Sequence, residues 1–183
     1  VYHSKNVKYG FLITDVEDSK FIALTHSKST KDSYDYTDWG DNASLIYDAI
    51  AVGLGATNIK FSHLIFDNVR DIEYSYWCSR SSNLFGCAGL TDKKFCILNQ
   101  QYNEEEYFDL RNKIIQQMNE APYVDKGGRI YKYGEFFPLE ISPFAYNETV
   151  VQEYFSLTKE EARAQKFSWK DPEERNYQIT KQP

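Results

Sequence analysis

The stretch YDYTDWGDN at residues 34–42 combines aromatic rings with carboxylates. Its candidate binding residues are Tyr34, Asp35, Tyr36, Asp38, Trp39 and Asp41. Aromatic rings stack on sugar faces and carboxylates accept hydrogen bonds from hydroxyl groups, while carboxylate oxygens also bind hard cations. The stretch therefore predicts a binding site. The alternative interpretation is an enlarged corner of the fold, in which the rings pack on a neighbouring segment and the Asp residues end turns.

A second candidate surface lies further along the chain and contains Tyr74, Tyr76, Trp77 and Arg80. Tyr76 and Trp77 are its predicted binding residues, because their rings offer contact area near another corner of the fold. The second surface joins the first only if the two corners stack.

Catalysis has less support in the sequence. His3, His26 and His63 are scattered, and none forms a recognisable arrangement with an acid and a Ser or Cys nucleophile. The stretch GLGAT at 53–57 lacks the Lys-Ser/Thr pair of a phosphate-binding loop. In an enzyme, the acid and base would come from Asp35, Asp38 and Asp41. We predict neither a catalytic residue nor a cofactor.

The three cysteines Cys78, Cys87 and Cys96 are spaced nine residues apart, whereas zinc knuckles use spacings of about two to four. Cys87 and Cys96 both fall at a repeat position that otherwise holds small residues. We therefore expect buried structural thiols and do not adopt the alternative, a zinc site completed by His63. Three thiols cannot all pair within one chain, which favours a reducing compartment, the cytoplasm.

The elements that must position these residues follow from an internal repeat. NVKYGFLITD at 6–15 and NIKFSHLIFD at 58–67 are nearly the same ten residues, 52 positions apart. A shorter unit, which begins with a polar turn residue and has an aromatic residue fourth, starts at residues 6, 18, 32, 44, 58, 71 and 83. Apolar residues alternate within a unit, as in a short strand with one buried face, and Asn, Asp, Ser and Gly at its boundaries indicate turns.

These units predict a mainly β fold, a small parallel β-solenoid over residues 1–99 in which two units form one coil of about 26 residues. Equivalent aromatic residues would then form ladders along the coils: Tyr9, Phe21, Tyr47, Phe61, Tyr74 and Phe95. An antiparallel sandwich with strands at similar spacing is the alternative, but it gives no reason for the same residue types to recur.

Residues 100–183 are predicted to form a capping helix and a helical or extended tail packed on the solenoid. Apolar residues in 103–119 recur at helical spacing, and Asn103 and Glu106 form a capping box. An amphipathic helix here would cover the open end of the last coil. Residues 123–147 are expected to be extended, short helices to begin at Asn147 and Thr158, and 170–183 to form a frayed tail.

Composition excludes several classes of function. The net charge is −6 and the longest basic run is Lys93-Lys94, so we expect no nucleic-acid binding by this segment. No run of about 18 apolar residues occurs, and the N-terminus lacks a signal-peptide pattern, so we expect no membrane association. The chain begins at Val1 and not at Met, which suggests a fragment.

Two segments carry a resemblance: NLFGCAGLTDKKFCILNQQYNEEEY at 83–107 and YGEFFPLEISPFAYNETVVQEYFSLTKEEA at 133–162. They resemble a family of uncharacterised proteins from candidate-phyla bacteria, in which a similar block is followed by Cys-rich segments like zinc ribbons. The resemblance implies a bacterial origin but no activity. This chain stops at Pro183, before any such ribbon.

The expected function is a non-catalytic binding or scaffolding module, because solenoids present repeated exposed rows to extended partners such as proteins or polysaccharides. A carbohydrate-binding or carbohydrate-active β-helix protein is the alternative. A third hypothesis is a carrier of nucleic-acid-binding zinc ribbons that this chain lacks.

Overall fold

The computed structural model describes residues 2–24 and 26–172, so most of the predicted C-terminal tail lies outside the described residues. The chain divides into two compact units. The solenoid unit contains Val1–Tyr123 and Tyr131–Phe137, and the C-terminal unit contains Val124–Ile130 and Pro138–Pro183. No helix in the described part is long and apolar enough to cross a membrane.

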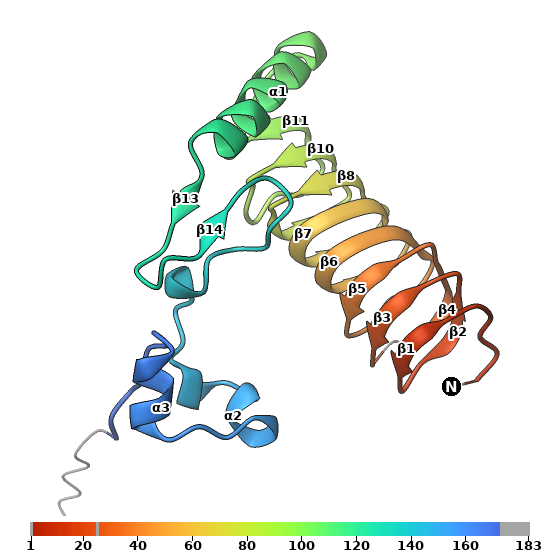
Figure 1. The fold of residues 1–183 in the computed structure, drawn as a ribbon. Helices are drawn as coiled ribbons and strands as arrows, with labels where there is room; N and C mark the ends of the chain where they lie inside the picture. The colour runs from red at the N-terminus through yellow and green to blue at the C-terminus, as the bar shows by residue number, and fades with distance from the viewer. Residues whose placement is uncertain (1, 25, 173–183) are drawn as a thin grey trace, which may run out of the picture. The chain divides into compact units, whose positions relative to one another are not determined.

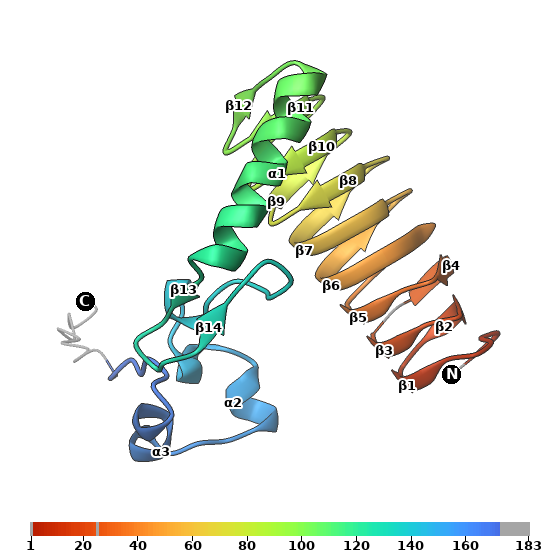
Figure 2. The ribbon, with the colours of Figure 1, turned by 45° about the horizontal axis from the view of Figure 1, so that its top comes forward.

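The solenoid unit is built from short strands that pair in parallel from one coil to the next, which confirms the predicted fold class (Figure 1 and Figure 2). The strands are β1 (Lys8–Phe11), β2 (Thr14–Glu17), β3 (Lys20–Ala23), β4 (His26–Lys31), β5 (Tyr34–Thr37), β6 (Ala43–Gly53), β7 (Thr57–Phe66), β8 (Arg70–Glu73), β9 (Tyr76–Ser79), β10 (Ser82–Phe85), β11 (Lys94–Ile97) and β12 (Gln100–Gln101). The short β12 turns back and pairs antiparallel with β11.

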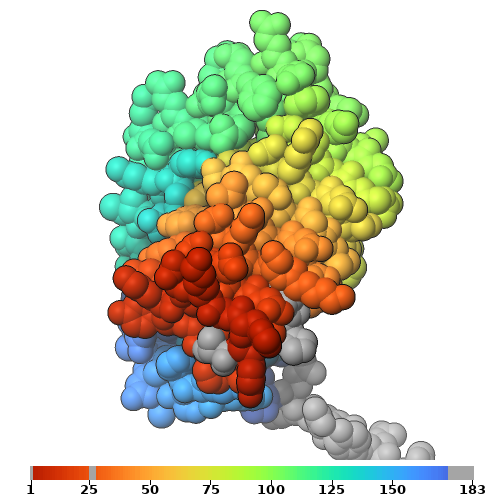
Figure 3. Space-filling model, turned by 90° about the vertical axis from the view of Figure 1, so that its right-hand side faces the viewer, coloured from red at the N-terminus to blue at the C-terminus, as the bar shows by residue number. Residues whose placement is uncertain are grey.

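The predicted coil length of about 26 residues is wrong, because one repeat unit already completes a turn. Lys8 pairs with Lys20, Lys20 with Tyr34 and Tyr34 with Tyr47, which are steps of 12, 14 and 13 residues. About seven turns stack in this way. The first coils, coloured red and orange, follow one another in Figure 3. The prediction assumed that the chain bends once in each repeat unit, so that two units are needed to close a coil. The chain in fact bends several times within each unit, and one unit closes the coil.

These bends come from residues in the left-handed backbone conformation, which recur at every third position. In the first two coils they are Asn6, Tyr9, Leu12, Asp15, Asp18, Phe21 and Leu24, with φ between 46° and 58°. Most L-residues are strained at such angles, but Asn and Asp tolerate them. The predicted boundary residues Asn6, Asp18, Asp32, Asn58, Asp71 and Asn83 have positive φ, which confirms their role as turn residues. Ser44 is the exception, because it lies within β6 and the left-handed residue there is Leu45.

Side chains at equivalent positions of consecutive coils stack in columns inside the solenoid. Ile46, Ile59, Ile72 and Leu84 occupy equivalent positions in consecutive coils and are at most 1% exposed. In another column, the backbone N–H of Ser75 donates to Ser62 Oγ at 3.1 Å. Burial of apolar side chains supplies the main stabilisation, while small hydroxyl residues bind the backbone of the next coil.

Aromatic rings form a continuous row along the coils, which we call the aromatic ladder. Its rungs are Tyr9, Phe21, Tyr34, Tyr47, Phe61, Tyr74 and Phe85, and the centroids of neighbouring rings lie 4.7 to 5.6 Å apart. The predicted ladder is confirmed except at its end. Phe95 is not a rung, because it aligns with the corner residue Asn83 and its ring contacts Tyr107 and Phe108.

Helix α1 (Glu104–Glu120) begins with the predicted capping box. The side chain of Asn103 accepts the backbone N–H of Glu106, and the Glu106 carboxylate accepts the N–H of Asn103. Tyr107 is the buried residue of the helix and packs with Phe85 of β10. Figure 2 shows α1 lying across β10 and β11. The helix thus caps the last coil, as predicted.

The remaining elements are short. They are β13 (Tyr123–Val124) and β14 (Ile130–Tyr131), which pair in a two-stranded sheet, and η1 (Leu139–Ile141), η2 (Tyr146–Glu148), α2 (Val151–Tyr154) and α3 (Lys159–Ala164). Helix α3 has the predicted capping box between Thr158 and Glu161. The predicted helix from Asn147 is replaced by η2 and α2, and packing of the C-terminal unit on the solenoid stays a prediction.

Substitutions of two isoleucines in β6 test which face of the strand packs in the core. Ile46 is 1% exposed and Ile50 is 39% exposed. Ile46→Ala leaves a cavity and should lower the free energy of unfolding by about 2–5 kcal/mol. Ile50→Ala should cost about 1 kcal/mol or less. Denaturant unfolding of both variants is the measurement, and equal losses would contradict the register described here.

Candidate functional site

The residues predicted from the stretch 34–42 do not converge on one site. Tyr34 is a rung of the aromatic ladder and is 39% exposed, whereas Tyr36 is fully buried. The Tyr36 hydroxyl contacts the backbone carbonyl oxygens of Trp39 and Val52, and burial raises its pKa. Tyr36 is therefore a core residue that holds the corner, and its prediction as a binding residue is wrong.

The end of the same stretch forms a corner of the solenoid. Asp38 and Trp39 both have positive φ, at 62° and 54°. The carboxylate of Asp41 accepts the backbone N–H of Lys28 at 3.0 Å. Asp41 thus ties the corner to the neighbouring coil, which favours the corner interpretation for this part of the stretch.

The second predicted surface lies apart from the first along the solenoid. Thr37, Ile50, His63 and Tyr76 follow one another in one column of consecutive coils. Three coil steps of about 4.8 Å place Tyr76 roughly 14 Å from the coil of Thr37. Tyr76 and Trp77 are 45% and 56% exposed, with ring centroids 6.1 Å apart. They form a separate exposed pair.

The aromatic ladder is open to solvent along one half. Its first four rungs, Tyr9, Phe21, Tyr34 and Tyr47, are 73%, 38%, 39% and 41% exposed, and we call them the exposed rungs. The next rung, Phe61, is only 2% exposed. A contiguous exposed aromatic row is unusual on a folded surface and marks an interaction site.

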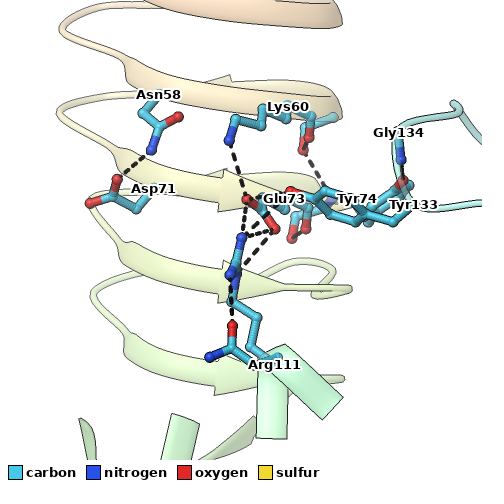
Figure 4. A network of polar contacts seen from close by, with 11 residues as sticks. Asn58, Lys60, Asp71, Glu73, Tyr74, Arg111, Tyr133 and Gly134 are labelled. Carbon is cyan, nitrogen blue, oxygen red and sulfur yellow. Dashed lines mark hydrogen bonds and ion pairs between the residues drawn. The ribbon is translucent and has the colours of Figure 1, made fainter. Parts of the chain in front are cut away.

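The other half of the ladder is covered by residues Tyr131–Phe137, which we call the strap. The ring of Tyr133 lies 5.9 Å from that of Phe61, and the ring of Phe137 lies 5.8 Å from that of Tyr74. The backbone N–H of Gly134 donates to the Tyr74 hydroxyl at 3.0 Å, and this hydroxyl donates to the carbonyl of Glu135 at 3.0 Å (Figure 4). The strap makes a turn here, in which the Glu135 N–H donates to the Lys132 carbonyl at 3.2 Å, so the ladder binds a turn of the chain through both rings and backbone groups.

A buried carboxylate fixes the strap in this place. Glu73 of β8 is 5% exposed and accepts hydrogen bonds from Arg111 of α1, whose Nη2 lies 2.7 Å from Oε1 (Figure 4). The Tyr133 hydroxyl donates to the same oxygen at 3.1 Å, and Lys60 Nζ lies 3.7 Å from it. A buried charge is tolerated because it is paired and hydrogen-bonded. Burial and Glu73 together raise the pKa of Tyr133 to about 12.

Carboxylates gather where the exposed rungs meet the strap. Asp35 and Asp48 face each other on adjacent coils, because Tyr34 pairs with Tyr47 and Tyr36 with Ala49. Burial, then the charges of Asp35 and of Glu135 in the strap, raise the pKa of Asp48 to about 6. The surface between the exposed rungs and the strap is therefore negatively charged.

A hollow of about 530 Å³ runs beside the exposed rungs. Its lining includes Lys8, Lys20 and Tyr34, and from the neighbouring corner column Asn6, Asp18 and Asp32. Lys20 leans over the rungs, and its Nζ lies 4.7 Å from the centroid of Phe21. The exposed half therefore offers aromatic surface and the positive charge of Lys20, with the carboxylates of Asp18 and Asp32 in the neighbouring corner column.

The three thiols are buried, as predicted, but they do not share a column. Cys87 follows Ser62 and Ser75, whereas Cys96 aligns with Leu84, so its assignment to the small-residue column was wrong. Burial raises the pKa of Cys87 to about 11 and also raises that of Cys78. Thiols of this kind are unreactive small hydrophobes. Within residues 2–24 and 26–172, no group of three or more His, Cys, Asp or Glu side chains is arranged to hold a metal ion.

Comparisons with protein-family models, with curated proteins and with solved structures each returned no match.

Two tyrosines of the ladder test how the strap is held. Tyr74→Phe removes the hydroxyl that binds Gly134 and Glu135, and it should cost about 1–2 kcal/mol and speed amide exchange at Gly134. Tyr47→Phe is the matched control, because Tyr47 lies on the exposed half. Hydrogen exchange resolved by residue is the measurement. Unchanged exchange at Gly134 in Tyr74→Phe would show that the strap does not depend on this hydroxyl.

The carboxyl of Asp48 gives a stability that depends on pH. Its pKa is about 6 in the folded protein and about 3.9 in an unfolded chain, so the folded state binds its proton more tightly. Stability should fall as pH rises from about 4 to 6 and stay lower above. Asp48→Asn should therefore raise the midpoint of thermal unfolding at pH 7.5 and remove this slope.

Thermal unfolding between pH 4 and 8 checks the Asp48 prediction. Asp35→Asn serves as a graded control, because it removes the second cause of the shift but leaves burial in place. It should recover part of the gain. An Asp48→Asn variant with an unchanged pH profile would show that Asp48 titrates normally.

Proposed function

We propose that the protein is a non-catalytic binding module whose exposed rungs take up an aromatic segment of a partner polypeptide. The observation that supports it is the strap. On rungs Phe61 and Tyr74 the chain already holds such a segment, with rings from Tyr133 and Phe137 packed on the ladder. The exposed rungs continue the same row without a cover.

A polypeptide is favoured over a polysaccharide because of how the ladder binds the strap. A tyrosine hydroxyl of the ladder accepts one backbone N–H and donates to the next carbonyl. Tyr34 and Tyr47 are tyrosines of the same row and have exposed rings. Tyrosine is favoured at protein interfaces for this combination of apolar ring and polar end.

Binding is favoured over catalysis because the carboxylates considered for acid–base chemistry are dispersed. Asp35 lies beside the ladder, Asp38 belongs to the corner, and Asp41 is occupied by a backbone N–H. A glycosidase needs two carboxyl groups flanking one bond, roughly 5–9 Å apart. Asp35 and Asp48 on adjacent coils come near this arrangement, so a carbohydrate-active enzyme is the alternative that a turnover assay with Asp35→Asn tests.

The proposal includes the location of the protein in the cell. A cytoplasmic location is supported by the free cysteines Cys78, Cys87 and Cys96, since a reducing compartment keeps thiols unpaired. Kinship with the candidate-phyla bacterial proteins, and a role as carrier of nucleic-acid-binding zinc ribbons, stay predictions.

Two double variants distinguish the ladder from the second exposed pair. Tyr34→Ala/Tyr47→Ala removes two exposed rungs, and Tyr76→Ala/Trp77→Ala is the matched control. Synthetic peptides with two aromatic residues and an array of glycans are the probes. We expect peptide binding that the ladder variant weakens about tenfold or more, since buried aromatic anchors carry much of the binding energy.

Each other outcome overturns part of the proposal. Peptide binding that only Tyr76→Ala/Trp77→Ala abolishes would move the site to the second exposed pair. Binding of a glycan and of no peptide would identify a carbohydrate module. Turnover of a bound glycan, lost in Asp35→Asn, would identify an enzyme. Circular dichroism of each variant confirms that the solenoid is intact.

A further inference from the structure

One register column of the solenoid holds ladder rings in some coils and charged side chains in others. Its members, in coil order, are Lys8, Lys20, Tyr34, Tyr47, Lys60 and Glu73. In the covered half, Lys60 has a carboxylate partner, since its Nζ lies 3.7 Å from Glu73 Oε1. In the exposed half the column holds lysines and no acid.

The ammonium group of Lys20 lies beside aromatic rings, whereas that of Lys60 lies beside a carboxylate. Its Nζ lies 5.8, 4.7 and 5.7 Å from the ring centroids of Tyr9, Phe21 and Tyr34. Across the described residues, no carboxylate comes within ion-pair distance of this ammonium. A cation held over aromatic rings keeps its charge and attracts an anion in the same apolar surroundings. The second coil is therefore a place for a ligand carboxylate.

The fourth coil carries negative charge, in contrast to the positive charge of Lys20 on the second coil. Asp48 faces Asp35 from the neighbouring coil. The negative charge of Glu135 in the strap also contributes to the raised pKa of Asp48. A cation placed beside Asp35 and Asp48 would relieve the repulsion that these two facing carboxylates exert on each other. The exposed rungs thus have a positive end and a negative end, with aromatic surface between them.

We infer that the ligand is an extended peptide with a carboxylate at Lys20, a basic side chain at Asp35 and Asp48, and aromatic residues between. This inference rests on the proposed function. Lys20 and Asp48 lie two coil steps apart, which is roughly 10 Å. An extended chain advances about 3.3 Å per residue, so the acidic and basic residues are about three positions apart. The sequence Glu-Tyr-Phe-Lys has this spacing.

Four synthetic peptides test the inference on the full chain. They contain the cores Glu-Tyr-Phe-Lys, Glu-Tyr-Phe-Glu, Lys-Tyr-Phe-Lys and Glu-Ser-Ser-Lys. Titrations followed by amide NMR shifts report weak as well as strong binding. We expect Glu-Tyr-Phe-Lys to bind about three- to fivefold more tightly than Glu-Tyr-Phe-Glu or Lys-Tyr-Phe-Lys, whose two charges have the same sign, as exposed ion pairs contribute modestly. Glu-Ser-Ser-Lys should show no binding.

A charge reversal identifies the residue responsible. Lys20→Glu should make Lys-Tyr-Phe-Lys bind better than Glu-Tyr-Phe-Lys, which reverses the order found with the unmodified protein. Lys94→Glu is the matched control, because Lys94 is an exposed lysine of the last coil, far from the exposed rungs. It should leave the order unchanged. If Lys20→Glu does not fold, Lys20→Met should still remove the preference for the acidic residue.

The results distinguish this inference from the proposed function. If the three aromatic peptides bind equally well, the charge assignment is overturned and the binding module remains. If none of the peptides shifts the amides of the exposed rungs, the proposed function itself fails. If the order is unchanged in both Lys20 variants, another charged group selects the ligand.

Discussion

The constraint on which the structure depends is the closing of one coil within 12 to 14 residues. Backbone pairing with the next coil requires each turn to end where the previous one did, so every position repeats. Left-handed residues at every third position make such short turns possible. One repeat therefore produces the isoleucine core, the Asn and Asp corners and the aromatic ladder together, and none of these rows could exist in another register.

Glu73 decides where the ladder is covered. Its buried carboxylate would be costly alone, and it is stable because Arg111, Lys60 and Tyr133 converge on it. These partners come from a helix, the preceding coil and the strap. A single charge thus connects the cap and the strap to one coil, while the rings of Phe61 and Tyr74 supply the apolar contact.

The sequence was informative wherever the deciding contacts are local. The corners at Asn and Asp, the capping boxes and the recurring rings could be predicted, because each depends on residue types within a few positions. The coil length could not, since alternation does not show how many bends a unit makes. The exposed half of the ladder and the strap were missed because Tyr133 is 60 residues from Glu73, and Arg111 is 38 from it.

The strap cannot serve as the ligand of the exposed rungs, although both halves of the ladder contain tyrosines. In the register column of Glu73, the earlier positions hold Lys8, Lys20, Tyr34, Tyr47 and Lys60, and none of these is a carboxylate. The Tyr133 hydroxyl donates to Glu73, and neither a lysine nor a tyrosine at this position supplies a carboxylate acceptor. Moving the strap would also leave Glu73 and Arg111 buried without Tyr133. Charge therefore holds the strap on its own rungs and leaves the remaining aromatic row to a ligand of different charge.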